Sequence, residues 1–124
     1  MKKQYEIMVL DDEEIVCENL EKYFKKKDFI VEAFTESQKA LDRLKEKKFD
    51  VVITDLKMAG PDGIDVLVYL KSQDTDTQVI IITGYADMES RLAAEYKNAF
   101  SYLLKPFKMD ELERLVMKAA KKSR

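Results

Sequence analysis

The chain has 124 residues, of which 46% are hydrophobic and 37% are charged, and this balance is typical of one folded domain rather than a disordered segment. The formal net charge of −2 gives no basic footprint for nucleic acid, and the lack of histidine removes the commonest general base and the usual zinc ligand sets. The single cysteine, Cys17, excludes a disulfide framework within the chain, so we expect a cytoplasmic protein.

The first apolar run, Glu6–Leu10, is too short for a membrane helix or a signal peptide, and acidic residues beginning at Asp11 follow it directly. A second run spans Ile30–Phe34. Apolar residues spaced three or four apart predict one helix before this second run and one after it. The residues on the inner faces of these two helices are Val16, Leu20, Tyr23 and Phe24, then Ala40, Leu41 and Leu44.

Two β-branched runs, Val51–Thr54 and Val79–Thr83, are nearly continuous and predict strands that are buried on both faces. Asp55 follows the first of them, and Pro61-Asp62-Gly63 supplies turn chemistry beyond it. Strand Val79–Thr83 ends in a single hydroxyl.

The last part of the chain predicts a weakly apolar helix from Asp87 to Asn98, a short strand at Tyr102–Leu104 and a final helix. Lys105 and Pro106 follow the strand. The final helix has acidic residues in its first turn and lysines in its last, which matches the helix dipole. Its inner face is Leu112, Leu115, Val116 and Ala119.

A strand followed by a helix, repeated five times, indicates an α/β domain with one parallel sheet covered by helices on both faces. Right-handed crossovers and coverage of both faces favour a doubly wound sheet with a topological switch point. We expect residues 1–124 to form this single domain.

The carboxyl ends of the predicted strands carry polar residues that meet at one edge of such a sheet. These residues are Asp11, Asp12, Asp55, Thr83 and Lys105. Clustered carboxylates repel one another unless a cation joins them, and oxygen ligands without histidine or cysteine suit a hard ion such as Mg²⁺. The ammonium and the hydroxyl suit the remaining oxygens of a phosphoryl group, so the edge fits phosphoryl transfer to a carboxylate.

Spacing alone leaves open which aspartate attacks phosphorus. The isolated position of Asp55 favours it as the nucleophile, whereas the adjacent Asp11 and Asp12 suit metal binding. Plainer interpretations stand beside these: the acids after Leu10 as a stabilised helix start, and Thr83 as an ordinary strand end.

The motifs MVLDDEE, VVITDLKM with GPDG, IITGYAD and YLLKPF resemble, in order and spacing, those of the bacterial two-component response regulator receiver domain over essentially the whole chain. The tetrad ITGY and the ending LLKPF are most similar to receivers of the nitrogen-regulation type. The resemblance implies a flavodoxin-like sheet with strand order 2-1-3-4-5.

The resemblance also implies the chemistry of the site. Asp55 would accept phosphate from a sensor kinase histidine and would contact the metal, Mg²⁺ or Mn²⁺. Asp12 would ligate the metal directly, Asp11 would help partly through water, and the backbone carbonyl of Lys57 would be a further ligand. Lys105 would pair with the phosphoryl group.

The same resemblance implies a conformational switch. Thr83 would bond to the phosphoryl group and move toward it, and Tyr102 would turn inward as Thr83 moves. Lys57 and Tyr85 occupy positions that tune the lifetime of the phosphoryl group in this family. The loop MAGPDG departs from the usual family pattern, since Ala59 stands where proline is common.

The expected partners are a sensor histidine kinase, an output domain or protein, and a second copy bound through the face of the helix Asp87–Asn98, the strand Tyr102–Leu104 and the final helix. No membrane contact is expected. A marginally packed helix shifts at little cost, so we expect phosphorylation to reposition Asp87–Asn98. Nucleic-acid binding within these residues is not expected.

Two other functional classes compete with the receiver interpretation. A Mg²⁺-dependent phosphatase with an aspartyl phosphate is disfavoured, because the chain lacks a D-x-D motif after its first strand and has no room for a cap domain. A degenerate receiver that works by contact alone is disfavoured, because all five site residues are present. The chain is therefore expected not to be an enzyme acting on an external substrate, and to catalyse only its own phosphorylation and slow dephosphorylation.

Overall fold

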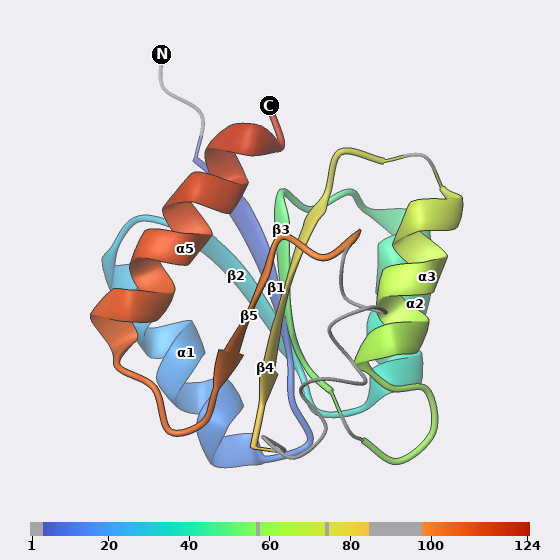
Figure 1. Cartoon of the computed structure of the whole chain (residues 1–124), viewed down its shortest axis with the longest axis horizontal. Coiled ribbons are helices and arrows are strands. Elements are labelled where there is room, and N and C mark those ends of the chain that lie inside the picture. The colour runs from blue at the N-terminus through green and yellow to red at the C-terminus, as the bar shows by residue number, and fades with distance from the viewer. Residues whose placement is uncertain (1–3, 57, 74, 85–97) are drawn as a thin grey trace.

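Five short apolar runs form the strands of one parallel sheet in the computed structural model, which describes residues 4–56, 58–73, 75–84 and 98–124. The sheet order is β2-β1-β3-β4-β5, as predicted, and Figure 1 shows the strands running side by side. Each predicted apolar run is a strand, with bounds that differ by at most one residue at either end. The bounds are β1 Glu6–Leu10, β2 Ile30–Phe34, β3 Val51–Asp55, β4 Gln78–Thr83 and β5 Ser101–Leu104.

Helices cover both faces of the sheet. Figure 1 shows α1 and α5 on one side and α2 and α3 on the other, which confirms the doubly wound arrangement. Their bounds are α1 Glu14–Lys26, α2 Ser37–Glu46, α3 Gly63–Ser72 and α5 Met109–Lys122. The predicted helix Asp87–Asn98 lies, apart from Asn98, outside the described residues. None of the described helices is both long and apolar enough to cross a membrane.

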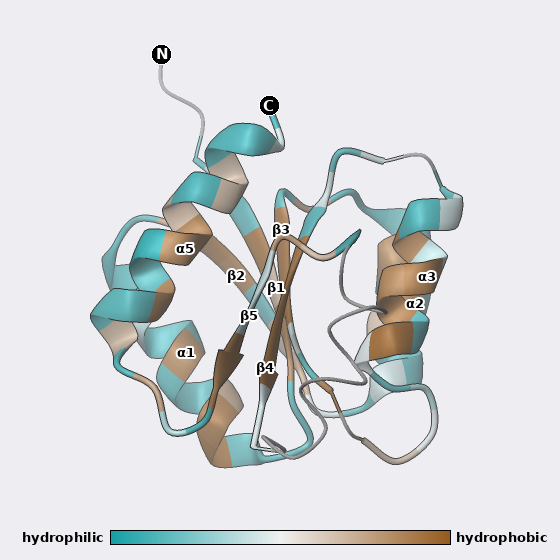
Figure 2. Ribbon diagram, viewed as in Figure 1, coloured by the Kyte–Doolittle hydropathy of each residue, from teal (hydrophilic) through white to brown (hydrophobic). Residues whose placement is uncertain are grey.

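The core is divided by the sheet into two layers, and the pleat decides which side chain enters which layer. In β1, Ile7 and Val9 pack toward α1 and α5, whereas Met8 and Leu10 pack toward α2 and α3. All four side chains are fully buried. Successive side chains of a strand point to opposite faces, so a strand buried on both faces must be apolar at every position. Figure 2 shows the brown strands between two helical layers whose outer faces are teal.

A salt-bridged clamp closes the amino edge of the sheet, where Figure 1 also places the end of α5. Asp50 precedes β3 and accepts hydrogen bonds from the backbone N–H of Glu6 at 2.8 Å, the hydroxyl of Ser123 at 2.9 Å and the guanidinium of Arg124 at 2.9 and 3.0 Å. Arg124 also donates to the backbone carbonyl of Gln4 at 2.9 Å. The clamp therefore ties the end of α5 to the starts of β1 and β3.

The start of α3 lies directly against the end of β3. The backbone N–H of Gly63 donates to the carbonyl of Leu56 at 2.9 Å, and a Cβ at Gly63 would lie 2.5 Å from the carbonyl oxygen of Asp55. Asp62 caps the helix by accepting from the N–H of Asp65 at 3.0 Å, and the Asp65 carboxylate accepts from the N–H of Asp62 in return. The loop between Asp55 and Asp62 is thus closed by a contact that only glycine permits.

Replacement of Gly63 by alanine is expected to destabilise the fold by about 1–3 kcal/mol, because the methyl group forces the backbone of α3 away from β3. Chemical denaturation measures the change. Gly84→Ala is the matched control, since a Cβ there meets no described atom within 4 Å. Equal effects of the two substitutions would contradict the close-approach argument.

Replacement of Asp50 by asparagine is expected to lower the free energy of unfolding by about 1–3 kcal/mol near neutral pH, because the clamp loses its charge-assisted hydrogen bonds. Burial opposes the ionisation of Asp50, but the hydrogen bonds from Arg124, Glu6 and Ser123 outweigh it and lower the pKa of this carboxyl.

A lowered folded-state pKa stabilises the protein above the unfolded pKa of about 4, and this stability is lost as the pH falls through the folded value. The difference between wild type and Asp50→Asn should therefore shrink as the pH falls below about 4. Asp76→Asn is the control, because the Asp76 side chain is 77% exposed and its single ion pair, with Lys48, is long at 3.9 Å. A difference that persists unchanged at pH 2 would refute the assignment.

Candidate functional site

The topology brings the carboxyl ends of β1 and β3 together at the point where the strand order reverses. The chain moves from β1 to β2 on one side and later to β3 on the other, so the ends of β1 and β3 flank an open edge. Asp11 follows β1 and extends its pairing with β2, since its N–H donates to the carbonyl of Phe34 at 3.1 Å. Asp55 is the last residue of β3.

Three carboxylates converge at this edge as the sequence predicts. One carboxylate oxygen from each of Asp11, Asp12 and Asp55 lies within 4.8 Å of the other two. Asp11 is fully buried and Asp55 is 6% exposed, whereas Asp12 is exposed. The cluster therefore has a buried floor and an open side toward solvent.

The ammonium of Lys105, which follows β5, bridges the two buried carboxylates. Its Nζ lies 2.8 Å from Oδ2 of Asp11 and 3.1 Å from Oδ2 of Asp55. A third carboxylate, that of Glu13, lies 3.1 Å from the same nitrogen. The backbone places the lysine here, because the N–H of Lys105 donates to the carbonyl of Thr83 at 2.7 Å.

Burial and the neighbouring charges shift the protonation equilibria in the cluster. Burial raises the pKa of Asp11 above its usual range and the charge of Asp55 adds to the rise, although hydrogen bonds from Lys105 and the Glu13 backbone act against it. Burial alone would lower the pKa of Lys105, but its bonds to Asp11 and Asp55 outweigh burial and raise that pKa. Lys105 is therefore a cation at neutral pH.

Backbone donors fix the second oxygen of each buried carboxylate. The N–H of Leu56 donates to Oδ1 of Asp55 at 2.7 Å, and the N–H of Glu13 donates to Oδ1 of Asp11 at 2.8 Å. Each carboxylate is thus held between a backbone N–H and the Lys105 ammonium, which sets its orientation before any ligand arrives.

Thr83 and Tyr102 lie on the same face of the sheet. Tyr102 is opposite Ile81 in the pairing of β4 with β5, and Thr83 is two residues beyond Ile81, so the pleat turns all three side chains to the side of α2 and α3. Thr83 is 2% exposed and Tyr102 is half-buried. This placement brings the two predicted switch residues to adjacent strands.

Two predicted residues, Lys57 and Tyr85, lie outside the described residues, and so does the expected metal ligand at the Lys57 carbonyl. The loop that contains Ala59, which departs from the family pattern, is bonded to the start of α2. Ser37 at the start of α2 donates its hydroxyl to the carbonyl of Ala59 at 3.2 Å, and Gly60 adopts a φ of +77°.

Sequence reasoning missed two participants. Glu13 was counted only among the acids at a helix start, and its reach to Lys105 depends on how the chain turns after β1. The thiol of Cys17, to which no sequence motif points, donates to the carbonyls of Asp11 at 3.2 Å and Phe34 at 3.3 Å. Burial raises the pKa of this thiol to about 11, so it is an unreactive bridge between α1 and the edge.

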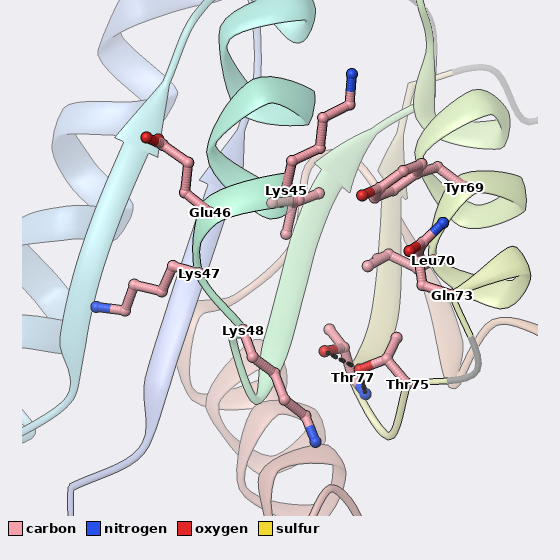
Figure 3. Close-up of a pocket in the computed structure, with 10 residues that line it drawn as sticks. Lys45, Glu46, Lys47, Lys48, Tyr69, Leu70, Gln73, Thr75 and Thr77 are labelled. Atoms are coloured by element: carbon pink, nitrogen blue, oxygen red, sulfur yellow. Dashed lines mark hydrogen bonds between the residues drawn. The ribbon is translucent and has the colours of Figure 1, made fainter.

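A pocket of about 260 Å³ opens at the opposite, amino edge of the sheet, between the ends of α2 and α3. Figure 3 shows the ammonium groups of Lys45, Lys47 and Lys48 pointing away from one another, while Thr75 and Thr77 are bonded to each other. Its polar groups do not converge on a common point. The convergent chemistry is at the carboxyl edge.

The donor set at the carboxyl edge fits a hard divalent cation. Three carboxylates offer oxygen ligands, and among the described residues the cluster holds neither a histidine nor a thiolate that would favour a softer metal. Asp12, Asp11 and Asp55 would hold the ion, and the exposed side of Asp12 leaves an entry path. A cation here would relieve the repulsion that Lys105 alone only partly offsets.

The comparison with protein families matches residues 7–117 to the response regulator receiver domain. The regulatory protein AtoC of Escherichia coli strain K12 is 35% identical over 113 residues, which are 91% of this chain and 24% of that protein. The transcriptional regulator NtrC of Proteus hauseri is 31% identical over 91% of this chain and 24% of its own length. The chain thus spans about a quarter of these relatives.

Solved structures agree with the fold. A response regulator receiver domain protein from Clostridium thermocellum has a TM-score of 0.85 and 31% identity over 94% of both chains. The response regulator TrrA from Thermotoga maritima, solved in complex with Mg²⁺-BeF, has a TM-score of 0.84 and 28% identity over 94% of this chain and 99% of that one.

Replacement of Asp12 by asparagine is expected to raise the melting temperature in the absence of divalent cations, because it removes one of the mutually repelling carboxylates without breaking a bond to Lys105. Addition of Mg²⁺ should raise the melting temperature of the wild type, since a ligand that binds only the folded state stabilises it, and should raise that of the variant much less. Differential scanning fluorimetry measures both.

Glu18→Gln serves as the control, because Glu18 is an exposed carboxylate of α1 outside the cluster. It should keep the full response to Mg²⁺. A response of Asp12→Asn to Mg²⁺ as large as that of the wild type would show that the ion binds elsewhere.

Proposed function

Because this chain belongs to the response regulator receiver domain family, we propose that Asp55 accepts a phosphoryl group from a histidine of a sensor kinase in two-component signalling. The observation that carries the proposal is the setting of Asp55, which is almost buried and is bonded to Lys105 within a cluster of carboxylates at the switch edge. No other carboxylate of the cluster ends a strand beside an ammonium while keeping a path to solvent.

In the proposed step, one carboxylate oxygen of Asp55 attacks phosphorus, and the bond between phosphorus and the kinase imidazole nitrogen breaks. The electron pair of that bond stays on the imidazole nitrogen, and the product on this chain is a mixed carboxylic-phosphoric anhydride. In the slow dephosphorylation that ends the signal, water attacks phosphorus, inorganic phosphate leaves and the Asp55 carboxylate is restored.

Lys105 is placed to stabilise the negative charge of the transferring phosphoryl group, since its ammonium already donates to Oδ2 of Asp55. It would neutralise an oxygen of the transferring group, and the Leu56 N–H would keep Asp55 oriented. The hydroxyl of Thr83 would donate a hydrogen bond to another oxygen of the phosphoryl group. A bound Mg²⁺ would supply charge neutralisation and orientation for the phosphoryl oxygens.

The proposed output is a movement of Thr83 that Tyr102 detects. Both side chains lie on the side of α2 and α3, so an inward shift of Thr83 would open space for the ring of Tyr102. The surface that includes β5 and α5 would then change shape and bind a second copy or another domain.

The relatives suggest the wider setting. AtoC and NtrC are named as regulators, and this chain corresponds to about a quarter of each, so we place an output domain or protein downstream of the switch. Residues 1–124 act as one receiver domain, in the cytoplasm, where a buried free thiol such as Cys17 is commonplace. Within this scheme the chain catalyses only its own phosphorylation and dephosphorylation.

Incubation with Mg²⁺ and acetyl phosphate is expected to add one phosphoryl group to the wild type and none to Asp55→Asn, as read by intact mass. The adduct should disappear on treatment with hydroxylamine, because an acyl phosphate is cleaved by this nucleophile. Asp42→Asn, which changes an exposed aspartate of α2, should be phosphorylated like the wild type. An adduct that survives in Asp55→Asn, or a wild type that gains none, would contradict the proposal.

A further inference from the structure

The ammonium of Lys105 has no spare hydrogen-bond donor in this structure. A lysine ammonium offers three donors, and three carboxylate oxygens lie within bonding distance: Asp11 at 2.8 Å, Asp55 at 3.1 Å and Glu13 at 3.1 Å. A phosphoryl oxygen can reach this ammonium only if one of these partners leaves. The identity of that partner decides how the site opens.

Two of the three partners are fixed. Asp11 is fully buried, and its other oxygen accepts from the Glu13 backbone N–H at 2.8 Å. Asp55 is 6% exposed, its other oxygen accepts from Leu56 at 2.7 Å, and it is the residue to which the phosphoryl group would be joined. Before a metal or a phosphoryl group is bound, neither carboxylate can leave Lys105 without a buried charge losing its partner, which is strongly unfavourable.

Glu13 is the partner that can leave. Its side chain is 59% exposed, so its carboxylate loses little when it exchanges Lys105 for water. The backbone N–H of Glu13 holds Asp11 whether or not the side chain stays, so the turn after β1 keeps its shape. Its neighbour Glu14 is also exposed, but it is the first residue of α1 and forms no ion pair with any described residue.

We propose that Glu13 is a competing partner for Lys105 that occupies the phosphoryl position on this ammonium and turns outward when a phosphoryl group arrives. Its negative charge opposes the approach of anionic phosphodonors and shifts the site toward its unphosphorylated state. Glu13 is thus a residue that determines donor specificity and phosphorylation rate. This inference rests on the proposed function of Asp55.

The competition predicts a dependence on donor charge. Glu13→Gln should increase the initial rate of phosphorylation by acetyl phosphate roughly threefold to tenfold at low ionic strength, because removal of one charge about 6–8 Å from the approaching donor is of that order. The gain should be smaller with phosphoramidate, which carries less negative charge, and should shrink in high salt. Loss of packing would produce neither dependence.

The experiment compares wild type, Glu13→Gln and Glu14→Gln, since the two variants lose the same charge and differ in the contact with Lys105. Three measurements are made: phosphorylation rates with both donors at low and high salt, the affinity for beryllofluoride with Mg²⁺, and the ¹⁵N signal of the Lys105 ammonium without metal. Glu13→Gln should be faster, bind beryllofluoride severalfold more tightly and shift the Lys105 signal. Glu14→Gln should resemble the wild type.

The outcomes separate the two proposals. If the wild type is phosphorylated at Asp55 and the two variants behave alike in all three measurements, the role of Glu13 is wrong while the proposed function stands. If the wild type neither gains a phosphoryl group nor binds beryllofluoride, both proposals fall together.

Discussion

Two buried carboxylates lie side by side at the carboxyl edge of the sheet, and the arrangement holds because one ammonium joins them. Asp11 and Asp55 would repel each other across a space that water enters poorly, and Lys105 touches both at 2.8 and 3.1 Å. Their second oxygens are bonded to backbone N–H groups, so neither carboxylate can turn away. The site is therefore rigid, over-supplied with negative charge and ready for a further cation.

The rest of the fold supports this edge. The parallel order puts the ends of β1, β3, β4 and β5 together, and the close approach of Gly63 to the Asp55 carbonyl fixes the start of α3 against the backbone of the proposed phosphoacceptor. At the other edge, the Asp50 clamp holds the strands' starts to the end of α5. The excess of negative charge in the carboxylate cluster thus lies at the end of the sheet where a bound cation would relieve it, and such a cost in stability is common at functional sites.

Sequence patterns predicted most of this because the decisive features are periodic or sit at strand ends. The short, β-branched apolar runs predict buried strands, and parallel topology then brings Asp11, Asp12, Asp55, Thr83 and Lys105 to one edge without further information. Glu13 could not be found in this way, because its contact with Lys105 depends on the rotamer of an exposed side chain after a turn. The Cys17 thiol and the close approach of Gly63 likewise depend on the packing of α1 and α3, which spacing does not encode. Lys57, Tyr85 and most of the segment Asp87–Asn98 remain sequence predictions.

A crystal structure of this chain with Mg²⁺ and beryllofluoride, which mimics a phosphoryl group, tests the role of Asp55 as phosphoacceptor most directly. We expect beryllium to be bonded to a carboxylate oxygen of Asp55, the cation to be held by Asp11, Asp12 and Asp55, and the Lys105 ammonium to have moved from Glu13 to a fluorine. Beryllofluoride on another carboxylate, or a Lys105 that keeps Glu13 and makes no contact with fluorine, would contradict this expectation.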